Sequence, residues 1–359
     1  MLHHILPRAL RGTRTPTWGT SCPSSARARR PDAFTACAAL GVALTVIGSL
    51  SACASAPSAR ETLSRLAADA DAGHLEPGAS SMGAPGPAAA AGERNGSTSP
   101  TGPLGAPAAA DALALGKAAL DGARRRALDL VQRAEAAPED RGLNGQAAQA
   151  LCDVADLSIH VALVARFRAE PPTSVTALVR GEDDLDGGLK RELEGLVRDA
   201  ARLARAALDA PGTPTEAEVA ALRQDEAFAE TLAAWAMGPT RAVLSGAGRR
   251  LPKLLAANRA LGSAREDASP LRLEGRFLSL APWPVGDSAG GRALLEEATA
   301  LAPVPMNALF LGDAAWLTDD PAAARAAWER ARTAELKGPV DALVQELATL
   351  RLAAAEPGE

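Results

Sequence analysis

Residues 306–336, MNALFLGDAAWLTDDPAAARAAWERARTAEL, decide the fold of this chain. Apolar residues recur at helical spacing on both sides of a short Asp-rich turn, which predicts two helices. Small residues and one tryptophan stand at fixed intervals: Gly312, Ala315, Ala324, Trp328 and Ala331. Large side chains at Gly312 and Ala324 would force apart two helices that cross there, whereas Trp328 can fill the space beside them. The stretch therefore predicts a closely packed antiparallel helix pair.

These intervals resemble those of the tetratricopeptide repeat (TPR), a helix–turn–helix unit of 34 residues. An earlier stretch repeats the scheme if four extra residues are allowed near positions 282–287: Gly275, Leu278, Gly291, Leu295, Ala298 and Pro303. A third and weaker match lies upstream: Ala127, Val131, Ala134 and Pro138. Together they favour a helical-repeat fold over an unrelated bundle. Residues 171–262 fit no repeat.

Helical periodicity covers most of residues 108–355, and Pro or Gly clusters separate the segments. We expect helices at 108–136, 143–169, 187–209, 214–237, 239–262, 268–281, 289–302, 305–318, 321–335 and 339–355. Thr213 and Asp320 each precede a proline and are predicted to be N-caps. No segment alternates for long enough to be a strand. The expected fold is all-α, with antiparallel helix pairs in a TPR-like α–α superhelix after a disordered N-terminal region.

Residues 1–52 have the organisation of a bacterial lipoprotein signal peptide. Three arginines precede the uncharged segment 33–50, which ends in small residues. The segment closes with four residues that resemble a lipobox: Leu50, Ser51, Ala52 and Cys53. The small residues let the signal peptidase approach the backbone, and the Cys53 thiolate would be the nucleophile that receives the lipid. An uncleaved transmembrane helix is the alternative, since about 18–20 apolar residues can span a bilayer.

Residues 53–107 are rich in Ala, Gly, Pro and Ser and are predicted to be a disordered tether. We expect at most a short amphipathic turn at 62–71. About 50 flexible residues would reach roughly 40 Å. Position 54, directly after the lipidated cysteine, is Ala rather than Asp, which resembles the sorting signal of lipoproteins directed to the outer membrane. The predicted location is the cell envelope, with the protein anchored through Cys53 to the outer membrane and facing the periplasm.

Composition excludes some functions. The net charge is −5, and a nucleic-acid binder would need a basic face to neutralise phosphates. Of the four cysteines, only Cys152 lies beyond the signal and the lipidation site. We expect this free thiol to be a buried core residue.

The sequence contains few candidate catalytic residues, so we predict no enzyme activity, no cofactor and no metal site. His160 is the only histidine beyond the tether and lies among apolar residues, which favours a structural role. The cluster at 182–186, EDDLD, could bind Ca²⁺ but lacks the other ligands of a calcium loop, so a solvated turn is favoured. Trp283, on the Pro-flanked insertion, either packs in the core or lines a ligand or partner groove.

A lipobox, a spacer, degenerate TPRs and the insertion LEGRFLSLAPWPVGDSAGGRALLEEATALAP resemble the T-component lipoproteins of TRAP transporters. The resemblance covers about 271–334 and, loosely, 108–163. It implies a TPR-like helical protein that associates with a periplasmic solute-binding protein and is linked to transport. The first hypothesis is a lipid-anchored scaffold for such protein–protein interaction, and a homo-oligomer is compatible with it. The alternatives are a carrier of a small apolar ligand and an envelope enzyme.

Overall fold

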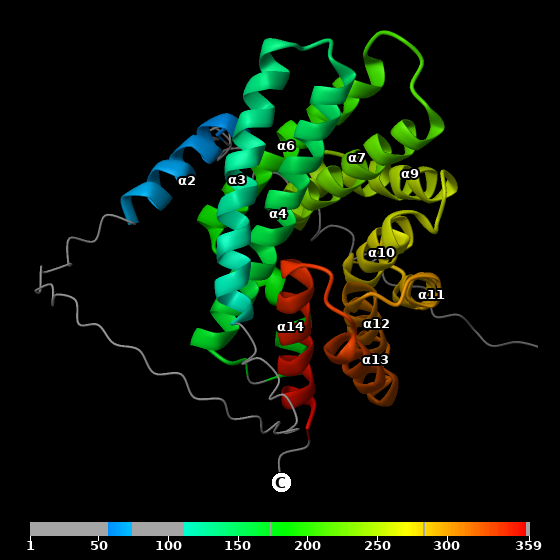
Figure 1. Cartoon of the computed structure of the whole chain (residues 1–359). Coiled ribbons are helices and arrows are strands. Elements are labelled where there is room, and N and C mark those ends of the chain that lie inside the picture. Colours follow the sequence, from blue (N-terminus) through cyan, green and yellow to red (C-terminus); the bar gives the residue numbers. More distant parts are fainter. Residues whose placement is uncertain (1–56, 74–110, 173, 283, 357–359) are drawn as a thin grey trace, which may run out of the picture. The chain divides into compact units, whose positions relative to one another are not determined.

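Ala- and Leu-rich segments with helical periodicity form helices throughout the part of the chain that the structure describes. The computed structural model describes residues 57–73, 111–172, 174–282 and 284–356 (Figure 1). All of them belong to one unit, Ala56–Glu359. Within these ranges there is no strand, so the all-α prediction is confirmed.

Most helices match the predicted segments, whereas α2, α5 and η2 lie where no helix was predicted. Their bounds are α2 Ala59–Gly73, α3 Ala112–Ala136, α4 Arg141–Ala169, α5 Val175–Val179, the 3₁₀ helix η2 Gly181–Asp184, α6 Gly187–Asp209, α7 Glu216–Met237, α8 Pro239–Leu244, α9 Ala247–Ala260, α10 Arg265–Leu280, α11 Ser288–Leu301, α12 Pro305–Leu317, α13 Pro321–Thr333 and α14 Pro339–Ala355.

Side-chain caps fix where several helices begin. Asp320 accepts a hydrogen bond from the backbone N–H of Ala323 and caps α13, as predicted. The predicted cap at Thr213 is wrong. Thr215 caps α7 instead, because Glu218 bonds back to the Thr215 N–H and completes a reciprocal capping box.

Consecutive helices pack in pairs: α3 with α4, α6 with α7, α10 with α11, and α12 with α13. This pairing is that of a TPR-like superhelix. The last helix, α14, packs against α13 and also against α3 and α4 (Figure 1). The C-terminal helix therefore joins the last repeat to the first helix pair.

Helix α4 forms the centre of the largest hydrophobic cluster, with Leu151, Val154 and Val164 fully buried. It is also the one helix, among those described, that is long and apolar enough to cross a membrane. Because 78% of its apolar window is buried inside the protein, its apolar character is explained by core packing.

Helix α2 differs from the prediction, which placed these residues in the tether with a turn at 62–71. It packs against α3 and α6, and both Ala59 and Leu63 are fully buried. The backbone N–H of Ala59 donates to Asp199 Oδ2 over 2.7 Å. An amphipathic stretch flanked by Pro- and Gly-rich sequence thus becomes ordered because it has an apolar surface to cover. The remaining tether residues, 53–56 and 74–107, lie outside the described residues, as does the signal 1–52.

Two further boundaries differ. The single helix predicted at 239–262 is broken into α8 and α9 at Gly246, whose φ of +77° suits glycine. Helix α10 begins with a left-handed turn, in which Glu266, Asp267 and Ala268 have φ of 48°, 56° and 60°. The regular part of α10 therefore starts after Ala268, close to the predicted start.

Candidate functional site

The repeat residues predicted from spacing lie at the helix crossings. A Cβ atom at Gly312 would stand 3.0 Å from Ala324 O and would also meet the Trp328 ring. A Cβ at Gly275 would stand 2.9 Å from Gly291 O, and one at Gly291 would stand 2.7 Å from Gly275 O. The other repeat residues are buried, each exposed by 1% or less: Ala298, Ala315, Ala324, Trp328 and Ala331. Two helix pairs thus make close backbone contact where the sequence has glycine.

A buried charge network, which sequence reasoning missed, lies beside the Gly312 crossing. Asp313 is 0% exposed. It accepts hydrogen bonds from Arg351 Nε at 2.6 Å, Arg276 Nη1 at 2.9 Å and Trp328 Nε1 at 3.1 Å. Arg276 also donates to Glu182 Oε1 over 3.1 Å. The network joins η2, α10, α12, α13 and α14, and each buried charge in it has an opposite partner.

The network also explains why one face of α12 cannot bind a partner. Asp313 is covered by Arg351 of α14. One turn further along α12, Trp316 Nε1 donates to Thr176 of α5 over 3.3 Å. This part of the repeat surface is therefore occupied by the chain itself.

The acidic cluster at 182–186 is used within the protein. Glu182 pairs with Arg276, and Asp184 pairs with Arg166 at 3.3 Å. Asp186 caps α6 by accepting from two backbone N–H groups, which lower its pKa. Since these carboxylates pair or cap, the cluster has the structure of an ordinary acidic turn.

A second set of carboxylates, contributed by separate elements, forms what we call the acidic face. It comprises Asp153 and Asp156 of α4, Asp225 of α7, Glu266 and Asp267 of the left-handed turn, and Asp341 of α14. Each carboxylate interacts electrostatically with another member or with one shared arginine, Arg272. Arg272 has no carboxylate within ion-pair distance among the described residues and bonds instead to Asn307 Oδ1 at 3.0 Å. Asp153 pairs with Arg126 at 3.1 Å and Asp267 with Lys337 at 3.4 Å, whereas Glu266 and Asp341 form no ion pair with a described residue, so the charge of the acidic face is only partly neutralised.

Three carboxyl groups of the acidic face have raised pKa values. Burial, followed by the charges of Glu266 and Asp153, raises the pKa of Asp225 to about 8. Burial also raises the pKa of Asp153 and of Glu266, although both side chains reach solvent. The pKa values of these carboxyl groups rise because surrounding protein atoms remove part of their hydration.

Asn307 holds the left-handed turn in place. It is fully buried, and its Nδ2 donates to the carbonyl oxygens of Asp267 at 2.9 Å and Ala302 at 2.8 Å. Three consecutive residues other than glycine with positive φ are strained. The side chain of Asn307 offsets that cost and fixes Glu266 and Asp267 on the acidic face.

His160 and Cys152 lie at the edge of this face. His160 Nδ1 is 2.8 Å from the carbonyl oxygen of Asp156, so the ring donates there and is fixed on its own helix. Cys152 is buried, which confirms the expected core position. Burial, with the charges of Asp225, Asp153 and Asp156, holds the pKa of the Cys152 thiol well above its ordinary value. The thiol is thus a poor nucleophile.

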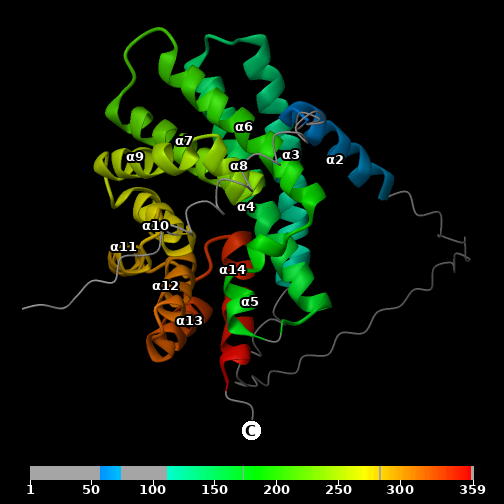
Figure 2. The ribbon, with the colours of Figure 1, turned by 180° about the vertical axis from the view of Figure 1, so that it is seen from behind.

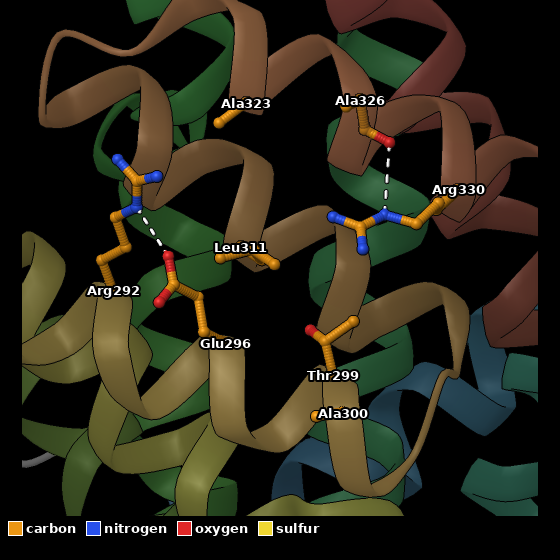
Figure 3. Close-up of a pocket in the computed structure, with 8 residues that line it drawn as sticks. All are labelled: Arg292, Glu296, Thr299, Ala300, Leu311, Ala323, Ala326 and Arg330. Carbon is orange, nitrogen blue, oxygen red and sulfur yellow. Dashed lines mark hydrogen bonds and ion pairs between the residues drawn. The ribbon is translucent and has the colours of Figure 1, made fainter.

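A hollow of about 380 Å³ lies between α11, α12 and α13 (Figure 3). Three charged side chains line it, together with smaller residues: Arg292, Glu296, Thr299, Ala300, Leu311, Ala323, Ala326 and Arg330. Arg292 pairs with Glu296 at 2.9 Å and with Asp320 at 2.9 Å. An apolar ligand would have to strip water from these charges, so the hollow suits such a ligand poorly.

The remaining candidates lie outside the described residues: Leu50, Ser51, Ala52, Cys53 and Trp283. Among the residues described, no group of three or more His, Cys, Asp or Glu side chains is arranged to hold a metal ion. In comparisons with known proteins, no family model matches the chain and no curated protein matches it.

Proposed function

We propose that this protein is a lipid-anchored helical scaffold of the cell envelope that binds a periplasmic protein through its acidic face. The observation that supports this most directly is the convergence of carboxylates from α4, α7, α10 and α14 around Asp225 and Arg272. Such a surface costs stability in the free protein, because like charges repel and hydration is incomplete. A basic segment of a partner would relieve that cost on binding.

The resemblance to the T-components of TRAP transporters suggests a solute-binding protein as the partner. The buried α12 face leaves the acidic face as the better candidate for recognition within the described helices. The hollow between α11 and α13 gives the small apolar ligand carrier no support, since three charged side chains line it.

Co-purification from solubilised membranes tests the binding proposal. Glu266→Gln with Asp267→Asn, both exposed members of the acidic face, should reduce recovery of the partner by at least about tenfold, since close charge pairs at interfaces contribute about 1.5 kcal/mol or more. The matched control is Glu329→Gln with Asp129→Asn, which neutralises two exposed carboxylates elsewhere. If both double variants recover the same proteins in equal amounts, the acidic face is not the binding surface.

The anchor has a separate test. Cys53→Ser should abolish acylation, measured by the mass of the N-terminal peptide, and should release the protein from washed membranes. Full acylation or unchanged membrane retention in the variant would contradict the proposed attachment through Cys53.

A further inference from the structure

The two most exposed large apolar side chains of the described chain are neighbours. Val243 is 67% exposed and Leu244 is 72% exposed, whereas the next most exposed, Leu336, is 51%. Both lie at the end of α8, which packs against α7 and α9 (Figure 2). Because Val243 and Leu244 are adjacent at one helix end, they form a contiguous apolar patch, here called the apolar point, whereas an isolated exposed leucine forms no patch.

This point lies in a basic segment of the chain. Residues 231–265 contain no acidic residue and six basic ones, Arg241, Arg249, Arg250, Lys253, Arg259 and Arg265, in a chain of net charge −5. The segment therefore has a local charge opposite to that of the whole protein.

The cations and the apolar point are adjacent. Arg250 Nη1 donates to the carbonyl oxygen of Ser245 over 3.1 Å, which places the guanidinium beside Leu244. Helix α9 buries Ala247, Leu251 and Leu255, so Arg249, Arg250 and Lys253 are on its exposed face. Arg249 and Lys253 form no ion pair with any described residue, whereas Arg250 pairs with Glu230 at 3.1 Å.

We propose that Val243, Leu244, Arg249, Arg250 and Lys253 form a membrane-docking tip that binds the interface of an anionic lipid bilayer. Exposed apolar side chains on α8 next to exposed cations on the contacting helix α9 match such an interface, where the apolar groups enter the acyl boundary and the cations meet phosphates. An acidic protein would satisfy the cations, but it would also need a pocket shaped for both Val243 and Leu244. A fluid lipid surface needs no such shape.

The tip goes beyond the proposed lipid anchor, because it contacts the membrane through residues far in sequence from Cys53. An anchor alone would hold the chain near a bilayer without fixing the orientation of the folded unit. Docking through α8 would set that orientation.

The test uses the full chain reconstituted into vesicles, with an environment-sensitive fluorophore attached at Leu244→Cys or, as the matched control, at Leu301→Cys. Leu301 is 49% exposed and lies on α11, away from the tip. Wild-type chain treated with the same reagent gives the background from native cysteines. In vesicles with about 30 mol% phosphatidylglycerol, emission at position 244 should shift to shorter wavelength and be quenched by spin-labelled lipid. Position 301 should show neither effect.

Charge is tested in the same assay. Arg249→Gln with Lys253→Gln should weaken docking about fivefold for each cation removed, and Arg330→Gln on α13 should leave it unchanged. Equal emission and quenching at positions 244 and 301 would overturn the proposal. So would a shift that follows addition of an acidic protein but not of anionic lipid. Flotation of Cys53→Ser on the same vesicles reports separately on the anchor.

Discussion

Substitution of Gly291 by alanine tests the close helix crossing on which the repeat fold depends. The added Cβ would lie 2.7 Å from Gly275 O and 2.8 Å from Ser279 N, both backbone atoms of α10. It would also lie 2.5 Å from Ser279 Oγ, which is itself bonded to Gly275 O. Because backbone cannot rotate away, α10 and α11 must separate.

Two effects oppose each other in this variant. Alanine favours a helix over glycine by about 0.5–1 kcal/mol, whereas overpacking a close contact costs about 1–3 kcal/mol or more. The clash with two backbone atoms should dominate, so we expect a net destabilisation of up to about 2.5 kcal/mol. For a folded unit of this size the melting temperature should fall by up to roughly 10 °C.

The chain provides a matched control in Gly122, an exposed glycine within α3, where an added Cβ would have no neighbouring atom inside 4 Å. Gly122→Ala should gain only the helix-propensity term and raise stability by about 0.5–1 kcal/mol. Calorimetry and urea unfolding measure both variants. Equal melting temperatures for the two, or a rise in Gly291→Ala, would mean that α10 and α11 do not cross at this distance.

Buried and strained groups supply three more predictions. Arg351→Met should lower the free energy of unfolding in urea by about 3–5 kcal/mol, because the buried Asp313 carboxylate keeps only one of its two arginine partners. As a control, the exposed Arg332→Met should lower it by less than about 0.5 kcal/mol. Asp225 binds its proton more tightly in the folded state, so it lowers stability as pH rises from about 4 towards 8, by at most about 1.4 kcal/mol per pH unit. Asp225→Asn should therefore stabilise the protein at pH 8 and change little at pH 4, and equal effects at both would contradict the raised pKa. Cys152 should resist alkylation until the chain unfolds, which peptide mass spectrometry can measure. Rapid labelling of the native protein would contradict this and place the thiol at the surface.

Much of the fold could be predicted from sequence because its determinants are local. The spacing from Gly312 to Trp328 lies within one helix pair, so a short window contains both sides of the contact. The four extra residues near 282–287 were also predictable, since Gly275 and Gly291 must still face each other. Helix ends proved less certain, because Thr213 and Thr215 are each followed three residues later by a glutamate, Glu216 and Glu218, and only the second pair forms the capping box.

The acidic face and the Asp313 network could not be predicted in the same way. Asp153, Asp225 and Asp341 are far apart in sequence, and each alone is typical of a solvated helix surface. They converge because α4 packs against α7 and because α14 returns to pack against α3 and α4. The order of α2 likewise depends on an apolar surface built by α3 and α6, which the composition of residues 53–107 does not reveal.

The distribution of charge suggests that partner binding and membrane docking are separate properties of one folded unit. The acidic face has an excess of carboxylates over cations, whereas the tip at Leu244 includes two cations, Arg249 and Lys253, that form no ion pair with any described residue. One arrangement attracts a basic partner and the other an anionic lipid surface, so salt should weaken both. Mutations should separate them: Glu266→Gln should reduce partner recovery without altering the fluorescence of the tip, and Lys253→Gln should do the reverse. If either variant changed both measurements, the two surfaces would be coupled through the fold, and their independent assignment would be wrong.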